Sequence, residues 1–164
     1  MGEVFARTPR LLVRRFRLAD TAVFCEYRSD PEIARYQSWD APFPLADAQR
    51  LVAEFVAADE RAPGWFQYAL ELRTTGALIG DVAVNRDGTR AELGFTLARQ
   101  YQGHGYATEA VRHVLDRVFG EGVRTVTAEF DPPNLASARL LGRVGFRLET
   151  GSGQLTSLEW PGNR

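Results

Sequence analysis

The chain has 164 residues, of which 45% are hydrophobic and 25% charged, and a formal net charge of −1; this fits a globular domain with a sizeable core and provides no basic field to bind nucleic acid or an anionic membrane. All 20 basic residues are Arg, which excludes a Schiff-base lysine, a Walker A phosphate loop and pyridoxal phosphate attachment. Because there are only two His and one Cys, and neither a signal peptide nor an apolar run of about 18 residues, we expect one cytoplasmic domain over residues 1–164 with no metal site.

The first sixty residues predict one strand followed by three helices. Asp20 is a good helix cap, and Pro31 after Asp30 occupies the position where proline favours a helix start. Apolar residues between 45 and 60 recur every three or four positions, the period of an amphipathic helix. The predicted segments are a strand at 10–17, helices at 21–28, from 30 onwards and at 45–60, and a loop at 38–44.

The middle of the chain predicts three strands at 65–72, 78–85 and 91–98. The segments that separate them, Thr74-Thr75-Gly76 and Asn85-Arg86-Asp87-Gly88, have the composition of hairpin turns. We therefore expect an antiparallel three-stranded meander.

The last third alternates between helix and strand. Apolar spacing and glycine predict a helix at 105–120 and a strand at 124–130, while Asn134 can cap a further helix that runs to 144. A closing hairpin is predicted at 146–150 and 155–160. The strand–helix–strand stretch 91–130 implies a parallel crossover. The fold class is therefore α/β (α+β), with a mixed seven-stranded sheet flanked by helices on both faces.

A glycine-rich turn carries the clearest chemical signal. Gly103 and Gly105 lie between a predicted strand and a predicted helix, where main-chain amides and the helix dipole could bind a diphosphate. The alternative is a simple strand-to-helix turn. A dinucleotide-binding fingerprint is excluded because Thr108 stands where the third glycine would be.

A second signal follows the next parallel strand, at Asn134 and Ser137. Ligands of α/β sheets bind at the carboxyl ends of parallel strands. We therefore expect these two residues to lie beside the glycine turn, although both could act only in capping the helix.

These motifs together resemble the GNAT N-acetyltransferases. Gln100-x-x-Gly103-x-Gly105 is similar to their acetyl-coenzyme A diphosphate motif. Asn134-x-x-Ser137 with Arg143-x-Gly145-Phe146, and the opening Thr8-x-Arg10-Leu11-x-x-Arg14, resemble the RimJ/RimL-like branch. The resemblance covers the chain to about residue 146.

The resemblance implies a splayed sheet that binds acetyl-CoA between two strands. Phe95, Thr96 and Leu97 would bind pantetheine, and Asn134 and Ser137 would face the thioester. The residues implied at the diphosphate are Gln102, Gly103, His104, Gly105, Tyr106 and Ala107.

The resemblance also implies acetyl transfer by direct attack of a primary amine, from a protein N-terminus or a small molecule. We expect Glu92 to act as the base, with Glu129 and Asp131 as alternatives, although Glu92 could be an ordinary solvated strand residue. Leu141 stands where many members have a tyrosine acid, which leaves Ser137 to hydrogen-bond the leaving thiolate. A non-catalytic acyl-CoA-binding module remains an alternative, and the chain could be a monomer or a homodimer.

Overall fold

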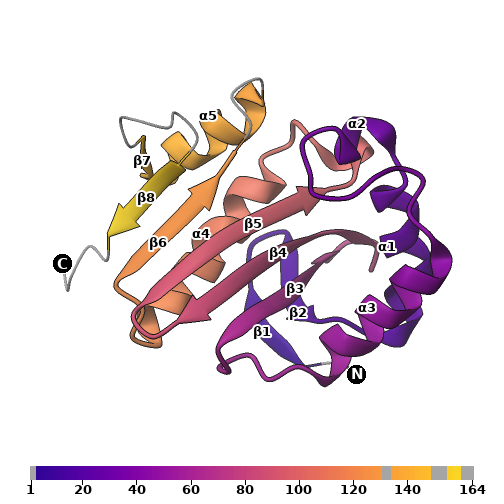
Figure 1. Ribbon diagram of the computed structural model, residues 1–164, viewed down its shortest axis with the longest axis horizontal. Coiled ribbons are helices and arrows are strands. Elements are labelled where there is room, and N and C mark those ends of the chain that lie inside the picture. The colour runs from indigo at the N-terminus through magenta and orange to yellow at the C-terminus, as the bar shows by residue number, and fades with distance from the viewer. Residues whose placement is uncertain (1–2, 131–133, 149–154, 160–164) are drawn as a thin grey trace.

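One eight-stranded mixed sheet forms the centre of the protein in the computed structural model, which describes residues 3–130, 134–148 and 155–159 (Figure 1). The strand order is β1-β2-β3-β4-β5-β6-β8-β7. Only β5 and β6 pair in parallel within the described residues, as the crossover predicted. The strands are β1 (Val4–Arg7), β2 (Leu11–Arg15), β3 (Gly64–Leu72), β4 (Leu78–Asp87), β5 (Arg90–Leu97), β6 (Thr125–Glu129), β7 (Arg147–Leu148) and β8 (Leu155–Glu159).

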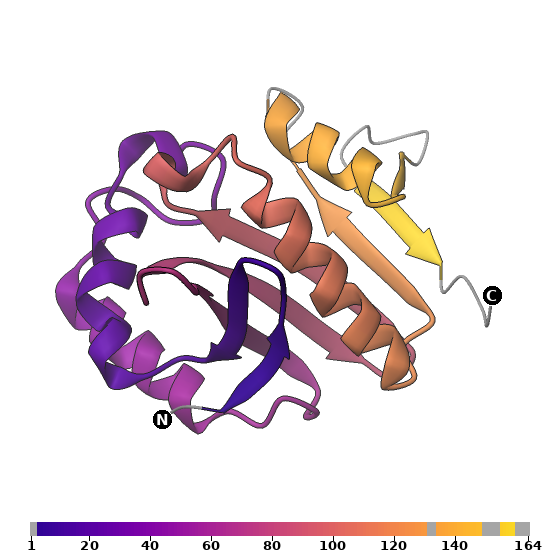
Figure 2. The same cartoon turned by 180° about the vertical axis from the view of Figure 1, so that it is seen from behind.

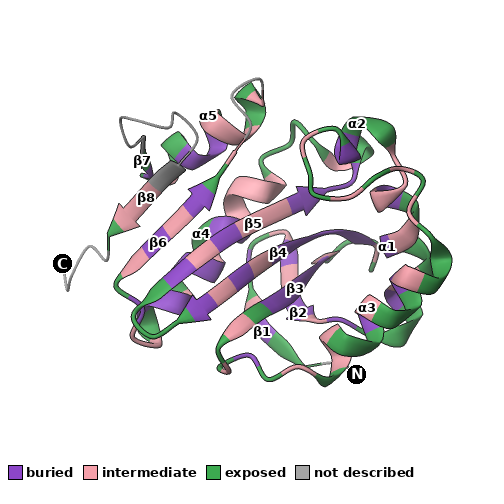
Figure 3. Cartoon of the chain, in the orientation of Figure 1, coloured by how far each residue is buried: buried purple, intermediate pink, exposed green. Residues whose placement is uncertain are grey.

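Helices cover both faces of this sheet, which confirms the predicted fold class (Figures 1 and 2). On β3, Tyr68 and Leu70 pack into the core beneath α4, whereas Ala69 between them packs against α1 and α3 on the opposite face. Because both faces are covered, β3 is buried without interruption over residues 66–70, and Figure 3 shows how much of the central strands is buried. The helices are α1 (Thr21–Arg28), α2 (Pro31–Ala34), α3 (Leu45–Ala57), α4 (Tyr106–Gly120) and α5 (Leu135–Arg143), with short 3-10 turns at Leu18–Asp20 and Arg99–Tyr101. None of the helices in the described residues is long and apolar enough to cross a membrane.

The structure adds one strand to the seven that were predicted. β1 has only four residues, and its pairing with β2 is interrupted by an irregularity between Val4 and Ala6. A strand this short and irregular has no periodic sequence signal.

Asp20 occupies the N-cap position of α1 and the bounds of that helix are confirmed, but the capping role predicted for its side chain is wrong. Its side chain makes no capping hydrogen bond to the helix. Instead, its two carboxylate oxygens accept hydrogen bonds from Arg14 at 2.8 and 2.9 Å. The side chain of Arg14 is only 2% exposed. A buried guanidinium needs a counterion, and this requirement decides the orientation of Asp20.

Candidate active site

The parallel strands β5 and β6 separate part of the way along their length. They pair only at Arg90, Ala91 and Glu92, opposite residues 125–127. Beyond Glu92, β5 continues to Leu97 and keeps its pairing with β4 on the other side. The edge of β5 that faces β6 is therefore open over residues 93–97.

Hydrogen-bonding groups of β5 point into this opening. The Ala98 amide donates to the Ile79 carbonyl at 2.8 Å, so in the alternating antiparallel ladder the main-chain groups of Leu97 turn away from β4. Accordingly, Gln102 Nε2 donates to the Leu97 carbonyl at 2.9 Å and Gln37 Nε2 reaches the Phe95 carbonyl at 3.5 Å. The Leu97 amide faces the same side.

The glycine turn is a candidate cradle of main-chain amides, although the amide of Gln102, which was expected to contribute, instead donates to the Arg99 carbonyl at 3.2 Å. Gly103 and Gly105 have φ values of 81° and 80°, a left-handed conformation that favours glycine. The first helical hydrogen bond of α4 in this turn runs from the Glu109 amide to the Gly105 carbonyl. Within the described residues, none of the amides of residues 103–108 has a hydrogen-bond acceptor. These donors lie at the positive end of a 15-residue helix, which suits an anion.

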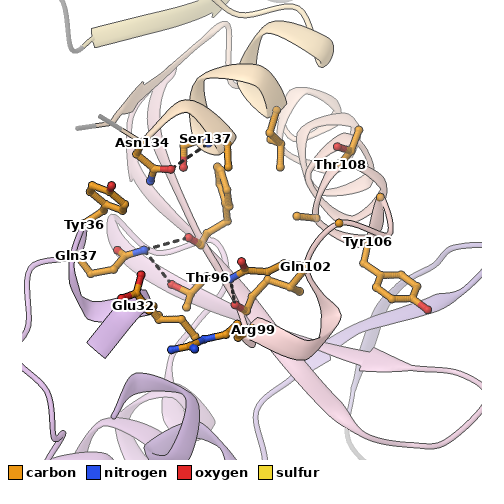
Figure 4. A pocket seen from close by; sticks show the side chains of 18 of the residues that line it. Glu32, Tyr36, Gln37, Thr96, Arg99, Gln102, Tyr106, Thr108, Asn134 and Ser137 are labelled. Carbon is orange, nitrogen blue, oxygen red and sulfur yellow. Dashed lines mark hydrogen bonds between the residues drawn. The ribbon is translucent and has the colours of Figure 1, made fainter. Parts of the chain in front are cut away.

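The start of α5 lies on the same cavity as the glycine turn. Asn134 Oδ1 accepts a hydrogen bond from the Ser137 amide at 3.3 Å, which confirms that Asn134 caps the helix. Both side chains also line the cavity, so the cap does not remove them from the site. Figure 4 shows these two residues on one side and Thr96 and Gln102 on the other.

The cavity has a volume of about 740 Å³, in the range of small-molecule sites. It joins the open end of β5, the glycine turn, the start of α5 and the α2 segment. Its lining residues are Glu32, Ile33, Tyr36, Gln37, Phe95, Thr96, Leu97, Arg99, Gln102, Gly103, Gly105, Tyr106, Ala107, Thr108, Asn134, Ala136, Ser137, Leu140 and Arg143.

Ten of the eleven expected cofactor residues are among the lining residues, and His104 is the exception. His104 is exposed, and its carbonyl accepts a hydrogen bond from Arg10. No local sequence signal pointed to Gln37, which reaches β5 across 58 residues from a turn after the four-residue helix α2. Only the folded chain brings these groups together.

Glu92 does not line the cavity; it lies at the last paired position before β5 and β6 separate. Partial burial raises the pKa of Glu92, and the charge of Glu129 raises it further, whereas a hydrogen bond from Asn85 lowers it. The two carboxylates are therefore close enough to interact. Asp131, the third candidate base, lies outside the described residues.

Comparisons with known proteins agree with this geometry. A family profile described as "Acetyltransferase (GNAT) domain" matches residues 10–147. The uncharacterized N-acetyltransferase p20 of Bacillus licheniformis is 30% identical over 146 residues, which cover 87% of this chain and 82% of p20.

Solved structures share the fold at low sequence identity. The ribosomal L7/L12 alpha-N-protein acetyltransferase RimL has a TM-score of 0.82 at 14% identity, with 98% of this chain and 96% of RimL covered. Mycobacterium smegmatis RimJ in complex with CoA-disulfide has a TM-score of 0.77 at 20% identity, with 91% and 81% covered.

Proposed function

The chain belongs to the GNAT family of acetyltransferases, and from this premise we propose that it transfers the acetyl group of acetyl-CoA to a primary amine by direct attack in a ternary complex. The observation that carries the proposal is the open edge of β5 beside a row of amides without acceptors, within the described residues. An extended, amide-containing arm that ends in a diphosphate has the chemistry to satisfy both features.

The residues present fit the acetyl donor. In the proposal, residues 103–107 hold the diphosphate through main-chain amides, each worth about 1.5–3 kcal/mol to a charged oxygen. Phe95 and Leu97 present main-chain groups to the pantetheine arm, whereas Thr96, whose main chain faces β4, lines the cavity beside it. Gln37 and Gln102, which occupy two of those carbonyls, would have to release them to the arm.

The reaction needs three groups from the protein. Glu92, through water, removes a proton from the ammonium so that the amine nitrogen can form a bond to the thioester carbon. The Leu97 amide donates to the acetyl oxygen as it gains charge, a contribution of about 2.7–4 kcal/mol for such a donor. As the carbon–sulfur bond breaks, Ser137 hydrogen-bonds the leaving thiolate, which takes up a proton from solvent, while the new amide nitrogen releases its second proton to solvent.

The acceptor is a protein N-terminus or a small amine. RimL, whose fold this chain shares, is named as an enzyme that acts on the α-amino group of a ribosomal protein. The cavity is bordered by Glu32, Tyr36 and Gln37 on the side away from the glycine turn, and we assign this side to the acceptor.

The decisive experiment is an acetyl-transfer screen with acetyl-CoA, small amines and peptides, followed by thiol release and mass spectrometry. We expect a product whose mass has increased by one acetyl group. Glu92→Gln should lower kcat about 100-fold or more, as the loss of a general base does. Glu54→Gln, an exposed carboxylate on α3, is the matched control and should leave kcat unchanged.

Two results would contradict the proposal. Binding of coenzyme A without turnover of any amine would favour the non-catalytic acyl-CoA-binding module. An unchanged kcat and pH profile in Glu92→Gln would remove that residue from the mechanism and leave Glu129 as the next candidate.

A further inference from the structure

The loop before β2 is fastened to the first turn of α4 through one carboxylate. Glu109 accepts hydrogen bonds from Thr8 Oγ1 at 2.5 Å, from the Arg10 amide at 3.0 Å and from Arg10 Nε at 2.8 Å. Its side chain is only 14% exposed. Residues separated by about 100 positions in the sequence are thereby locked together beside the glycine turn.

The other end of the Arg10 side chain contacts the glycine turn itself. Arg10 Nη1 donates to the His104 carbonyl at 2.7 Å, and the guanidinium lies 4.4 Å from the centre of the Tyr106 ring. A Cβ atom on Gly105 would lie 3.3 Å from Arg10 Nη2. One side chain therefore contacts His104 and Tyr106 and occupies the space beside Gly105 between them.

This contact fixes the direction of a main-chain amide. In a planar trans peptide the carbonyl and the following N–H point in opposite directions. Because Arg10 holds the His104 carbonyl, the Gly105 N–H must point away from Arg10. Gly105 lines the cavity, and its amide has no acceptor among the described residues.

Arg10 also cancels an unfavourable charge. Glu109 lies in the first turn of α4, next to the amides that would hold a diphosphate. An unpaired carboxylate there would repel that anion, whereas the ion pair with Arg10 neutralises it. Partial burial raises the pKa of Glu109, but the hydrogen bonds from Thr8 and Arg10 outweigh this and hold the pKa below its ordinary value.

We propose that Arg10, held by Glu109, is a positioning residue that orients the amides of the glycine turn for the diphosphate of the acetyl donor. The proposal rests on the proposed function and gives the Thr8-x-Arg10 motif a physical role. Arg10 acts through the His104 carbonyl and is not required to touch the reacting atoms.

The test compares two acetyl donors, acetyl-CoA and S-acetylpantetheine, because the second lacks the diphosphate. Arg10→Ala should lower the ratio of their kcat/KM values at least tenfold, through a higher KM for acetyl-CoA with kcat nearly unchanged. Arg10→Lys retains the charge but not the fork of donors and should fall between wild type and Arg10→Ala. Arg50→Ala, which removes the same charge from an exposed helical pair, is the control and should leave the ratio unchanged.

The double variant Arg10→Ala/Glu109→Gln separates charge from geometry. Removal of the unpaired carboxylate should restore part of the affinity for acetyl-CoA. An equal loss with both donors, or no loss with acetyl-CoA in either Arg10 variant, would overturn the inference. A wild-type protein that acetylates no amine would instead contradict the proposed function, and calorimetric titration of each folded variant with coenzyme A would then still test Arg10.

Discussion

The two ends of α4 differ in how completely their charged and polar groups are paired within the protein. At the C-terminal end, Arg86 and Arg117 surround Glu60, which also accepts a hydrogen bond from Tyr68 at 2.8 Å. Glu121 pairs with both arginines. At the N-terminal end, Arg10 and Glu109 form one ion pair, and the amides beside it keep their hydrogens free within the described residues.

This difference separates stability from function within one helix. The C-terminal cluster is closed: the side chains of Glu60 and Arg86 are each 8% exposed, and both carboxylate oxygens of Glu60 accept hydrogen bonds. The N-terminal end is open, since the Arg10 side chain is 41% exposed and the adjoining amides border the cavity. Donors that must bind a ligand cannot also be consumed by the fold.

The largest expected effect is at the closed end. Glu60→Gln removes the charge that pairs with the buried Arg86 and with Arg117, which is 30% exposed, and breaking a buried pair costs about 3–5 kcal/mol. We expect the free energy of unfolding to fall by about this amount in urea denaturation. The KM for acetyl-CoA should remain unchanged, because about 16 Å of α4, from Tyr106 to Arg117, separates the cluster from the glycine turn.

Glu54→Gln is the control for this substitution, because it changes an exposed carboxylate in a helical pair. It should alter the free energy of unfolding by no more than about 0.5 kcal/mol. If Glu60→Gln raised the KM for acetyl-CoA as much as Arg10→Ala, the two ends would be coupled and the comparison would be wrong.

A glycine at each end sharpens the contrast. Gly105 and Gly122 have φ values of 80° and 104°, so alanine at either position should cost about 1–2 kcal/mol of stability. Only Gly105→Ala should also raise the KM for acetyl-CoA, about tenfold, because its Cβ would press on Arg10 and displace the amides. Gly122→Ala meets no atom within 4 Å and serves as the control. Equal KM values in both variants would show that the glycine turn does not bind the donor.

The features that the sequence could predict are those that depend on neighbouring residues, whereas pairs formed between distant segments could not be predicted. The bounds of α4, the cap at Asn134 and the pairing order of β3, β4 and β5 depend on local periodicity and turn chemistry, and all are confirmed. The ion pair between Arg10 and Glu109 joins residues far apart in the chain, and so does the cluster around Glu60. Arginine and glutamate are too common for any local pattern to indicate such pairs. Asp20 differs from these cases, because Arg14 lies only six residues before it; the burial of that arginine, which capping preference does not register, drew the carboxylate away from the helix.

The smallest expected effect concerns Glu92, which differs from Glu60 and Glu109 in having no arginine within ion-pair distance among the described residues. The two paired carboxylates have pKa values below the ordinary one, whereas burial and the charge of Glu129 raise the pKa of Glu92. If Glu92 is the base, activity falls as the pH drops through this raised pKa, because the protonated form cannot accept a proton.

Glu129→Gln removes the neighbouring charge and should lower the pKa of Glu92. The acidic limb of the kcat/KM profile should therefore move to lower pH, while the rate on the plateau changes little. Glu54→Gln lies on α3, outside this pair, and should leave the limb in place. If the acidic limb of the kcat/KM profile stays in place in Glu129→Gln as it does in the control, a group other than Glu92 titrates there. A limb that moves to higher pH would mean that Glu129 stabilises the charged form of the base, which is the opposite of the repulsion argued for these two carboxylates.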